Sequence, residues 1–92
     1  MITFKYKIKN PCGIHARPAG HLASLAKKYD GCTILVNKGD GSSRDCNASN
    51  ILSIMGEQFK CGDDITFKVI SKDGLSEKDI KNELFNLLER HF

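Results

Sequence analysis

Residues 12–19 read Cys-Gly-Ile-His-Ala-Arg-Pro-Ala and contain the side chains best suited to chemistry. Pro18 favours the first turn of a helix, because its φ angle is fixed and it has no N–H to leave unpaired there. His15 is therefore predicted at or just before a helix N-cap, where free N–H groups and the helix dipole attract anions. Arg17 adds a permanently charged fork of donors that suits phosphate. An imidazole nitrogen in this setting is placed to carry a phosphoryl group.

The same residues resemble a known motif. Residues 13–19, Gly-Ile-His-Ala-Arg-Pro-Ala, are similar to the phosphorylation-site motif of the HPr family, the small histidine phosphocarrier proteins of the bacterial phosphotransferase system. A second block, residues 53–56 followed by residues 62–66, resembles the family's central helix and the glycine that leads into its last strand. The resemblance spans nearly the whole chain and is strongest around His15.

This resemblance implies a function. His15 would accept a phosphoryl group from the phosphoenolpyruvate-dependent Enzyme I, on the ring nitrogen nearer the backbone, and pass it to sugar-specific IIA-type proteins. Arg17 would position the phosphate, and Ala16, Arg17 and Pro18 would form the helix N-terminus that binds it. Such a protein is a phosphoryl-transfer intermediate rather than a free-standing enzyme. We expect it to be a monomer and to need no cofactor or metal.

The resemblance also implies a partner-binding surface beside His15. It would be formed by residues of two helices, namely Gly20, His21, Ile51, Leu52 and Met55. Many Gram-positive members carry a serine at the start of the central helix, and an ATP-dependent kinase phosphorylates it. When the sequences are aligned without a gap from Gly62 backwards, that position is Asn50, which can cap a helix but has no hydroxyl group. We therefore expect this regulatory site to be absent.

Three other interpretations compete with the phosphocarrier. His15 could be a structural histidine at a loop–helix junction, or the chain could be an HPr-like regulatory or adaptor protein that docks partners without passing phosphate on. A nucleic-acid-binding domain is the third, because residues 1–29 carry six basic and no acidic side chains. An intact His15 and Arg17 count against an adaptor. Lys5, Lys7 and Lys9 alternate with apolar residues, as on the solvated face of a strand, and no aromatic RNA-binding signature accompanies them, so no nucleic-acid partner is expected.

Length and composition bound the answer further. The 92 residues are expected to form one domain, residues 1–92, with a modest core. The chain is 40% hydrophobic and 27% charged, and it has no apolar run near the ~20 residues that a membrane span requires. The N-terminus does not resemble a signal peptide, since apolar residues alternate with lysines. These features predict a cytoplasmic protein that does not insert into a membrane.

The four cysteines, at positions 12, 32, 46 and 61, show no zinc-type spacing. We expect free thiols that are mostly buried, with Cys12 as the exception. Cys12 neighbours the predicted site, where the family more often has a small polar residue. A redox role is conceivable, but a single cysteine without a resolving partner favours a neutral packing substitution.

Hydrophobic periodicity predicts the elements that position His15. Strands are expected at residues 2–9, 32–37, 44–47 (an edge strand) and 65–71, and helices at residues 16–29, 51–56 after an Asn50 cap, and 77–91 after a Ser76 cap. Residues 10–13 form the loop that delivers His15, and His91 is expected to be a frayed helix end. The order β-α-β-β-α-β-α with amphipathic strands predicts an α+β fold, an open-faced β-sandwich with a four-stranded antiparallel sheet and three helices on one face.

Overall fold

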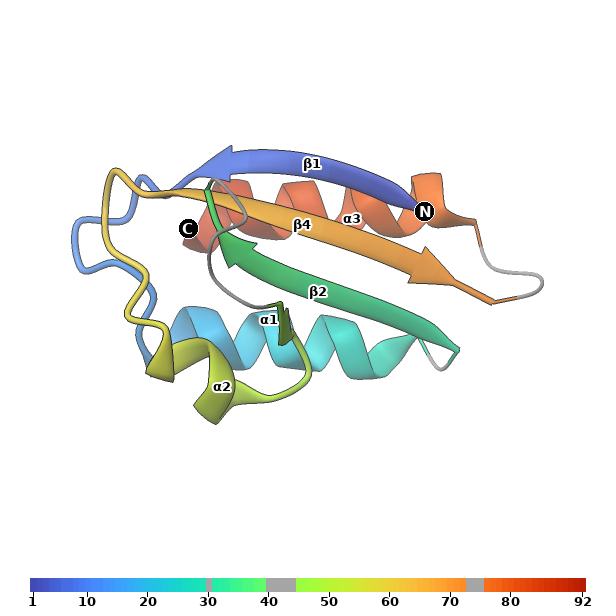
Figure 1. The fold of residues 1–92 in the computed structure, drawn as a ribbon, viewed down its shortest axis with the longest axis horizontal. Coiled ribbons are helices and arrows are strands. Elements are labelled where there is room, and N and C mark those ends of the chain that lie inside the picture. Colours follow the sequence, from blue (N-terminus) through green and yellow to red (C-terminus); the bar gives the residue numbers. More distant parts are fainter. Residues whose placement is uncertain (30, 40–44, 73–75) are drawn as a thin grey trace.

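Strands and helices follow the order β-α-β-β-α-β-α in the computed structural model, which describes residues 1–29, 31–39, 45–72 and 76–92 (Figure 1). The elements are β1 (Ile2–Lys7), α1 (Ala16–Lys28), β2 (Cys32–Lys38), β3 (Cys46–Asn47), α2 (Ile51–Gly56), β4 (Asp64–Ser71) and α3 (Glu77–His91). The expected order of elements is confirmed.

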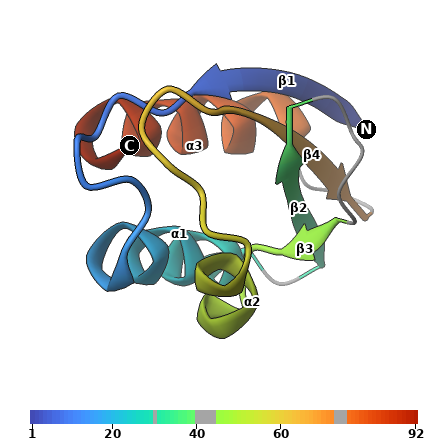
Figure 2. The same cartoon turned by 60° about the vertical axis from the view of Figure 1, so that its left-hand side comes forward.

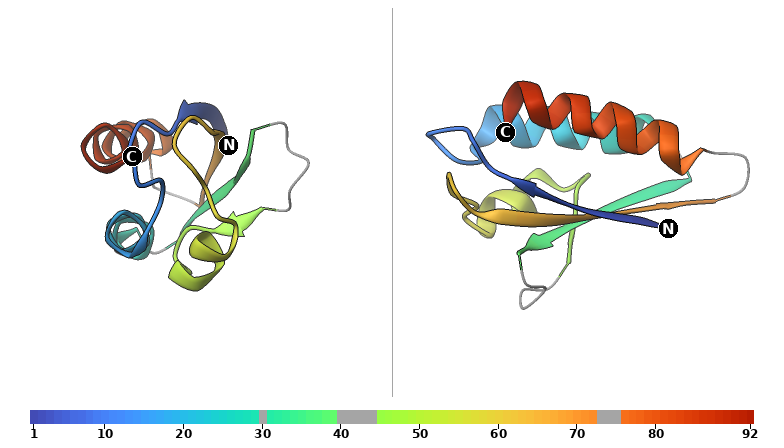
Figure 3. Two further views of the ribbon diagram at one scale, coloured as in Figure 1. Left: turned by 90° about the vertical axis from the view of Figure 1, so that its left-hand side faces the viewer. Right: turned by 90° about the horizontal axis from the view of Figure 1, so that it is seen from above.

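The strands form one antiparallel sheet in the order β1-β4-β2-β3. Helices α1 and α3 lie side by side across one face, with α2 beside α1 (Figures 1 and 3). This is the open-faced β-sandwich that the sequence predicts, and β3 is the edge strand. The long connection from β1 to α1 brings His15 to one end of the molecule, where the loop before β4 also passes.

Alternation along the strands places one face of the sheet against the helices. Phe4 of β1 lies opposite Phe67 of β4, and their rings stack with centroids 5.3 Å apart. The Tyr6 hydroxyl donates a hydrogen bond of 3.2 Å to the Leu88 carbonyl and so joins β1 to α3. The largest side chains of the core, each less than 2% exposed, are Phe67, Ile8, Leu22, Ile34, Ile54, Ile65, Ile80, Leu84, Leu88, Val36 and Val69.

Element ends differ from the expected ones by one or two residues. Strand β1 ends at Lys7, because Ile8 leaves the regular ladder: its N–H donates to the Asp63 carbonyl and its carbonyl accepts from Gly62 N–H. Helix α1 ends at Lys28, with Tyr29 as C-cap. The expected turn at residues 38–43 and the first residue of the expected edge strand fall largely on residues 40–44, which lie outside the described residues.

The prediction that the cysteines are mostly buried is wrong. All four are free thiols, but only Cys46 is buried, Cys32 is half-buried, and Cys12 and Cys61 are exposed. Both exposed cysteines lie in turns at the end of the sheet, where the backbone curves away from the core. Periodicity along helices and strands does not predict whether the side chains of such turn residues are buried or exposed.

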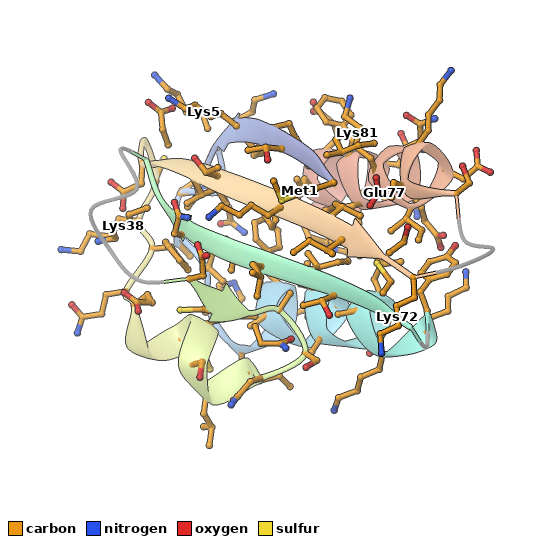
Figure 4. All side chains as sticks on the ribbon, turned by 45° about the vertical axis from the view of Figure 1, so that its right-hand side comes forward. Met1, Lys5, Lys38, Lys72, Glu77 and Lys81 are labelled. Atoms are coloured by element: carbon orange, nitrogen blue, oxygen red, sulfur yellow. The ribbon has the colours of Figure 1, made fainter. Side chains whose placement is uncertain are left out.

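The start of α3 is tied to the beginning of β1 and to the end of β4. The N-terminal ammonium of Met1 lies 2.8 Å from Glu77 Oε1 (Figure 4). The other carboxylate oxygen, Oε2, accepts a 3.0 Å hydrogen bond from Ser71 N–H at the end of β4. These two interactions lower the pKa of Glu77.

Candidate functional site

The loop between β1 and α1 runs beside the segment that leads from α2 to β4 (Figure 2). Near the start of the loop, Gly62 N–H donates to the Ile8 carbonyl at 2.8 Å. At its end, Ile14 N–H donates to the Phe59 carbonyl at 3.1 Å, and the side chains of Ile14 and Phe59 are both buried. The residue before His15 is therefore anchored by backbone and side chain together.

Gly13 occupies a position that only glycine fits. Its φ angle is +68°, in the left-handed region, and its N–H donates to the Asn10 carbonyl at 2.9 Å. A β-carbon at this position would lie 2.6 Å from the Phe59 carbonyl oxygen, which is backbone and does not move aside. The glycine thus allows the loop to approach the segment before β4 and to turn into α1.

His15 is exposed and is the N-cap residue of α1, as predicted. Its backbone is extended and its ring makes no capping hydrogen bond, so both ring nitrogens are left for other partners. The His15 carbonyl accepts from Ala19 N–H at 3.1 Å. Since Pro18 has no N–H, the first-turn donors left without a partner among the described residues are those of Ala16 and Arg17. These donors and the dipole of α1 favour an anion beside His15.

Two histidine side chains meet between α1 and the end of α3. The rings of His21 and His91 stack with centroids 4.0 Å apart and 14° between their planes. Burial lowers the pKa of His91, and the charges of His21, Arg90 and Arg17 lower it further. His91 is not a frayed end, because its ring packs on His21 and its carbonyl accepts from Asn10 Nδ2 at 3.0 Å.

Residues of the expected partner-binding surface come from two places. On α2, Leu52 is 81% exposed, Met55 is 39% exposed, and Ile51 is partly buried against the core. On α1, Gly20 is half-buried and His21 is exposed. His21 faces α3, whereas α2 packs on another side of α1, so α1 separates His21 from the apolar residues.

The expected caps are confirmed. Asn50 Oδ1 accepts a 3.2 Å hydrogen bond from Ser53 N–H at the start of α2, and the Ser76 hydroxyl caps α3 in the same way through Asp79 N–H at 3.3 Å. Cys12 is exposed, and its N–H donates to Asn10 Oδ1 at 2.9 Å.

Asn10 is the residue beside the site that sequence reasoning passed over. The sequence predicts it only as part of the loop of residues 10–13 that delivers His15. An asparagine before a proline signals a turn. The Asn10 side chain, however, also bonds to the His91 carbonyl, which is 81 residues further along the chain. No local sequence pattern reveals such a contact.

Within residues 1–29, 31–39, 45–72 and 76–92, no group of three or more His, Cys, Asp or Glu side chains is arranged to hold a metal ion. None of the helices in these ranges has the length and apolar character needed to span a membrane.

Comparison with known proteins gives matches over nearly the full chain. Residues 2–90 match the family model described as "PTS HPr component phosphorylation site". The phosphocarrier protein HPr of Mycoplasma pneumoniae is 34% identical over 84 residues, covering 91% of this chain and 89% of the relative. HPr of Mycoplasma genitalium is 35% identical over 91 residues, covering 99% and 97%. The crystal structure of an HPr from Thermoanaerobacter tengcongensis superposes with a TM-score of 0.82 at 29% identity, covering 100% of this chain and 96% of that one.

Proposed function

This chain belongs to the HPr family of phosphotransferase-system phosphocarriers, and from that membership we propose that His15 is the residue that carries the phosphoryl group. The observation that carries the proposal is the position of His15. It is exposed at the N-cap of α1, its ring is free of capping bonds, and the N–H groups of Ala16 and Arg17 are unpartnered beside it.

The transfer step follows from this arrangement. A ring nitrogen of neutral His15 forms a bond to phosphorus while the bond between phosphorus and its donor breaks, and the reverse exchange delivers the group to an acceptor. The backbone N–H groups and the Arg17 guanidinium receive the phosphoryl oxygens. Each charge-assisted hydrogen bond contributes about 1.5–3 kcal/mol, which positions the group. The site is open to solvent, so a partner can reach the phosphorus from outside.

Membership of the family implies contact with enzymes of the phosphotransferase system. We propose Enzyme I as the donor and sugar-specific IIA-type proteins as acceptors. The exposed apolar side chains of α2, Leu52 and Met55, supply the docking surface together with Gly20 of α1. His21 faces α3 on another side of α1 and would contact a partner separately. Docking there brings the active site of the partner to His15 at the start of the neighbouring helix.

Phosphorylation with phosphoenolpyruvate and purified Enzyme I tests the assignment of His15. The parent protein should gain the mass of one phosphoryl group, and acid should remove it, as expected for a phosphohistidine. His15→Ala should gain none, whereas His91→Ala, the matched control, should gain the same stoichiometric group. A labile phosphate on His15→Ala would remove His15 from the proposal. Absence of phosphate on the parent would favour the alternative, an adaptor that docks partners without carrying phosphate.

A further inference from the structure

Asn10 uses every polar group it has to connect the His15 loop with the end of α3. Its backbone N–H donates to the Phe92 carbonyl at 2.8 Å, and its side-chain Nδ2 donates to the His91 carbonyl at 3.0 Å. Its side-chain Oδ1 accepts from Cys12 N–H at 2.9 Å, and its backbone carbonyl accepts from Gly13 N–H at 2.9 Å. The side chain is half-buried, so these bonds are partly shielded from water.

The two donor bonds stabilise the end of a helix. The last carbonyl groups of a helix have no partner within it, and His91 is the last residue of α3. Asn10 supplies a partner for the His91 carbonyl, and the neighbouring Lys9 N–H also donates to the Phe92 carbonyl. Phe92 is only 3% exposed, so the end of α3 is itself fixed in the core.

The two acceptor bonds order the chain on the way to His15. Cys12 N–H donates to Asn10 Oδ1, and Gly13 N–H donates to the Asn10 carbonyl. Ile14 N–H donates to the Phe59 carbonyl. Pro11 has no N–H and a fixed φ angle. No residue between Asn10 and His15 therefore has a free backbone donor, and this limits the orientations in which the loop presents His15 to α1.

Asparagine is the side chain that these partners require. An amide offers an acceptor and a donor on the same carbon, one for Cys12 N–H and the other for the His91 carbonyl. Aspartate keeps the acceptor but has no donor, and its charge would lie at the negative end of the α3 dipole. Alanine loses both interactions.

We propose that Asn10 is a positioning residue for phosphoryl transfer, which holds the His15 loop against the fixed end of α3. The inference rests on the proposed role of His15. Reaction within a docked complex requires the attacking nitrogen and the N–H groups of α1 to be in place together, and a misplacement of about 1 Å can cost on the order of 100-fold in rate. By holding residues 12–14, Asn10 limits such misplacement of the ring.

The test compares Asn10→Ala, Asn10→Asp and the matched control Asn82→Ala, which changes an exposed asparagine of α3. Phosphoryl transfer from phosphorylated Enzyme I is measured as kcat and KM. We expect Asn10→Ala to lose about 10- to 100-fold in kcat with KM within about twofold of the parent, because docking through α2 is untouched. Asn10→Asp, which retains the Cys12 bond, should lie between Asn10→Ala and the parent, and Asn82→Ala should equal the parent.

A merely structural role is separated from positioning by NMR. In Asn10→Ala the amide signals of residues 12–17 should shift and exchange faster, while those of the sheet stay as in the parent. Equal kcat in Asn10→Ala and the parent would overturn the inference, as would a fall in kcat while the amide signals of residues 12–17 stay as in the parent. Absence of phosphate on the parent itself would instead contradict the role of His15.

If Asn10→Ala does not fold, hydrogen exchange of the parent protein tests the inference. Positioning by Asn10 requires the N–H groups of Cys12 and Gly13 to be protected from hydrogen exchange, to a degree comparable with the end of α3. Exchange of these two groups at the rate of an unstructured peptide would overturn the inference.

Discussion

At the scale of single residues, the proposed role of Arg17 in binding phosphate can be tested apart from the stability of the fold. The side chain is exposed, so Arg17→Ala should change the free energy of unfolding by no more than about 0.5 kcal/mol. Loss of its charge-assisted bonds to the phosphoryl oxygens should slow transfer by about 10- to 100-fold, corresponding to ~1.5–3 kcal/mol. Transfer rates from phosphorylated Enzyme I measure this effect. Equal rates in Arg17→Ala and the parent would remove Arg17 from the site.

Gly13 tests whether the approach of the loop to Phe59 matters for the fold. Gly13→Ala combines a left-handed φ angle with a β-carbon 2.6 Å from a carbonyl oxygen, so the free energy of unfolding should fall by about 2–4 kcal/mol. Gly20→Ala is the matched control, since nothing lies within 4 Å of its β-carbon and it stands inside α1. That variant should gain about 0.5–1 kcal/mol. Urea unfolding measures both, and similar values for the two variants would contradict the loop geometry.

At the scale of elements, α2 is short and owes its place to one buried side chain. Ile54 is fully buried, whereas Leu52 on the same helix is 81% exposed. Leu52→Glu should therefore leave the free energy of unfolding within about 0.5 kcal/mol of the parent but raise the KM for Enzyme I about tenfold. Ile70→Glu, on the exposed part of β4, is the control and should leave KM unchanged. A KM unaffected by Leu52→Glu would exclude this part of α2 from docking.

The start of α2 is the position at which we expect the serine-kinase site of Gram-positive relatives to be absent. Asn50 Oδ1 caps the helix through Ser53 N–H, and the Ser49 hydroxyl donates to Asn47 Oδ1 at 2.7 Å. We predict that the ATP-dependent kinase of Gram-positive relatives leaves the parent unmodified and phosphorylates Asn50→Ser, where the new phosphate would face the positive end of the helix. Asn50→Ala serves as the control. Stoichiometric, acid-stable phosphate on the parent at Ser49 or Ser53 would show that the regulatory position is elsewhere.

A feature of these elements can be predicted from the sequence when residues close together in the chain determine it. The strands and helices follow from periodicity. The cap at Asn50 follows from its side-chain acceptor, and the cap at Ser76 follows from Asp79 three positions later. His15 stands at its predicted N-cap because Pro18 fixes the first turn of α1. In contrast, the stacking of His21 on His91 and the bonds of Asn10 join distant parts of the chain. Cys12 and Cys61 are exposed because they lie in turns, and no periodic sequence pattern predicts which turn residues point to solvent.

At the scale of the whole molecule, the fold brings three separate segments to one end of the sheet. The β1–α1 loop carries His15, the segment before β4 anchors that loop through Phe59, and the end of α3 holds it through the His91 and Phe92 carbonyls. The His15 side chain is thus exposed while the backbone leading to it is fixed. A carrier needs both properties, since partners must reach the ring and find it in a constant orientation.

The most direct test is residue-resolved NMR of the three histidine rings during phosphorylation by Enzyme I and phosphoenolpyruvate. The chain contains only His15, His21 and His91, so each imidazole can be followed individually. We predict that phosphorus becomes coupled to the ring nitrogen of His15 nearer the backbone, and that the His21 and His91 rings remain unmodified. Phosphorus coupled to His21 or His91, with the His15 ring unchanged, would contradict the account.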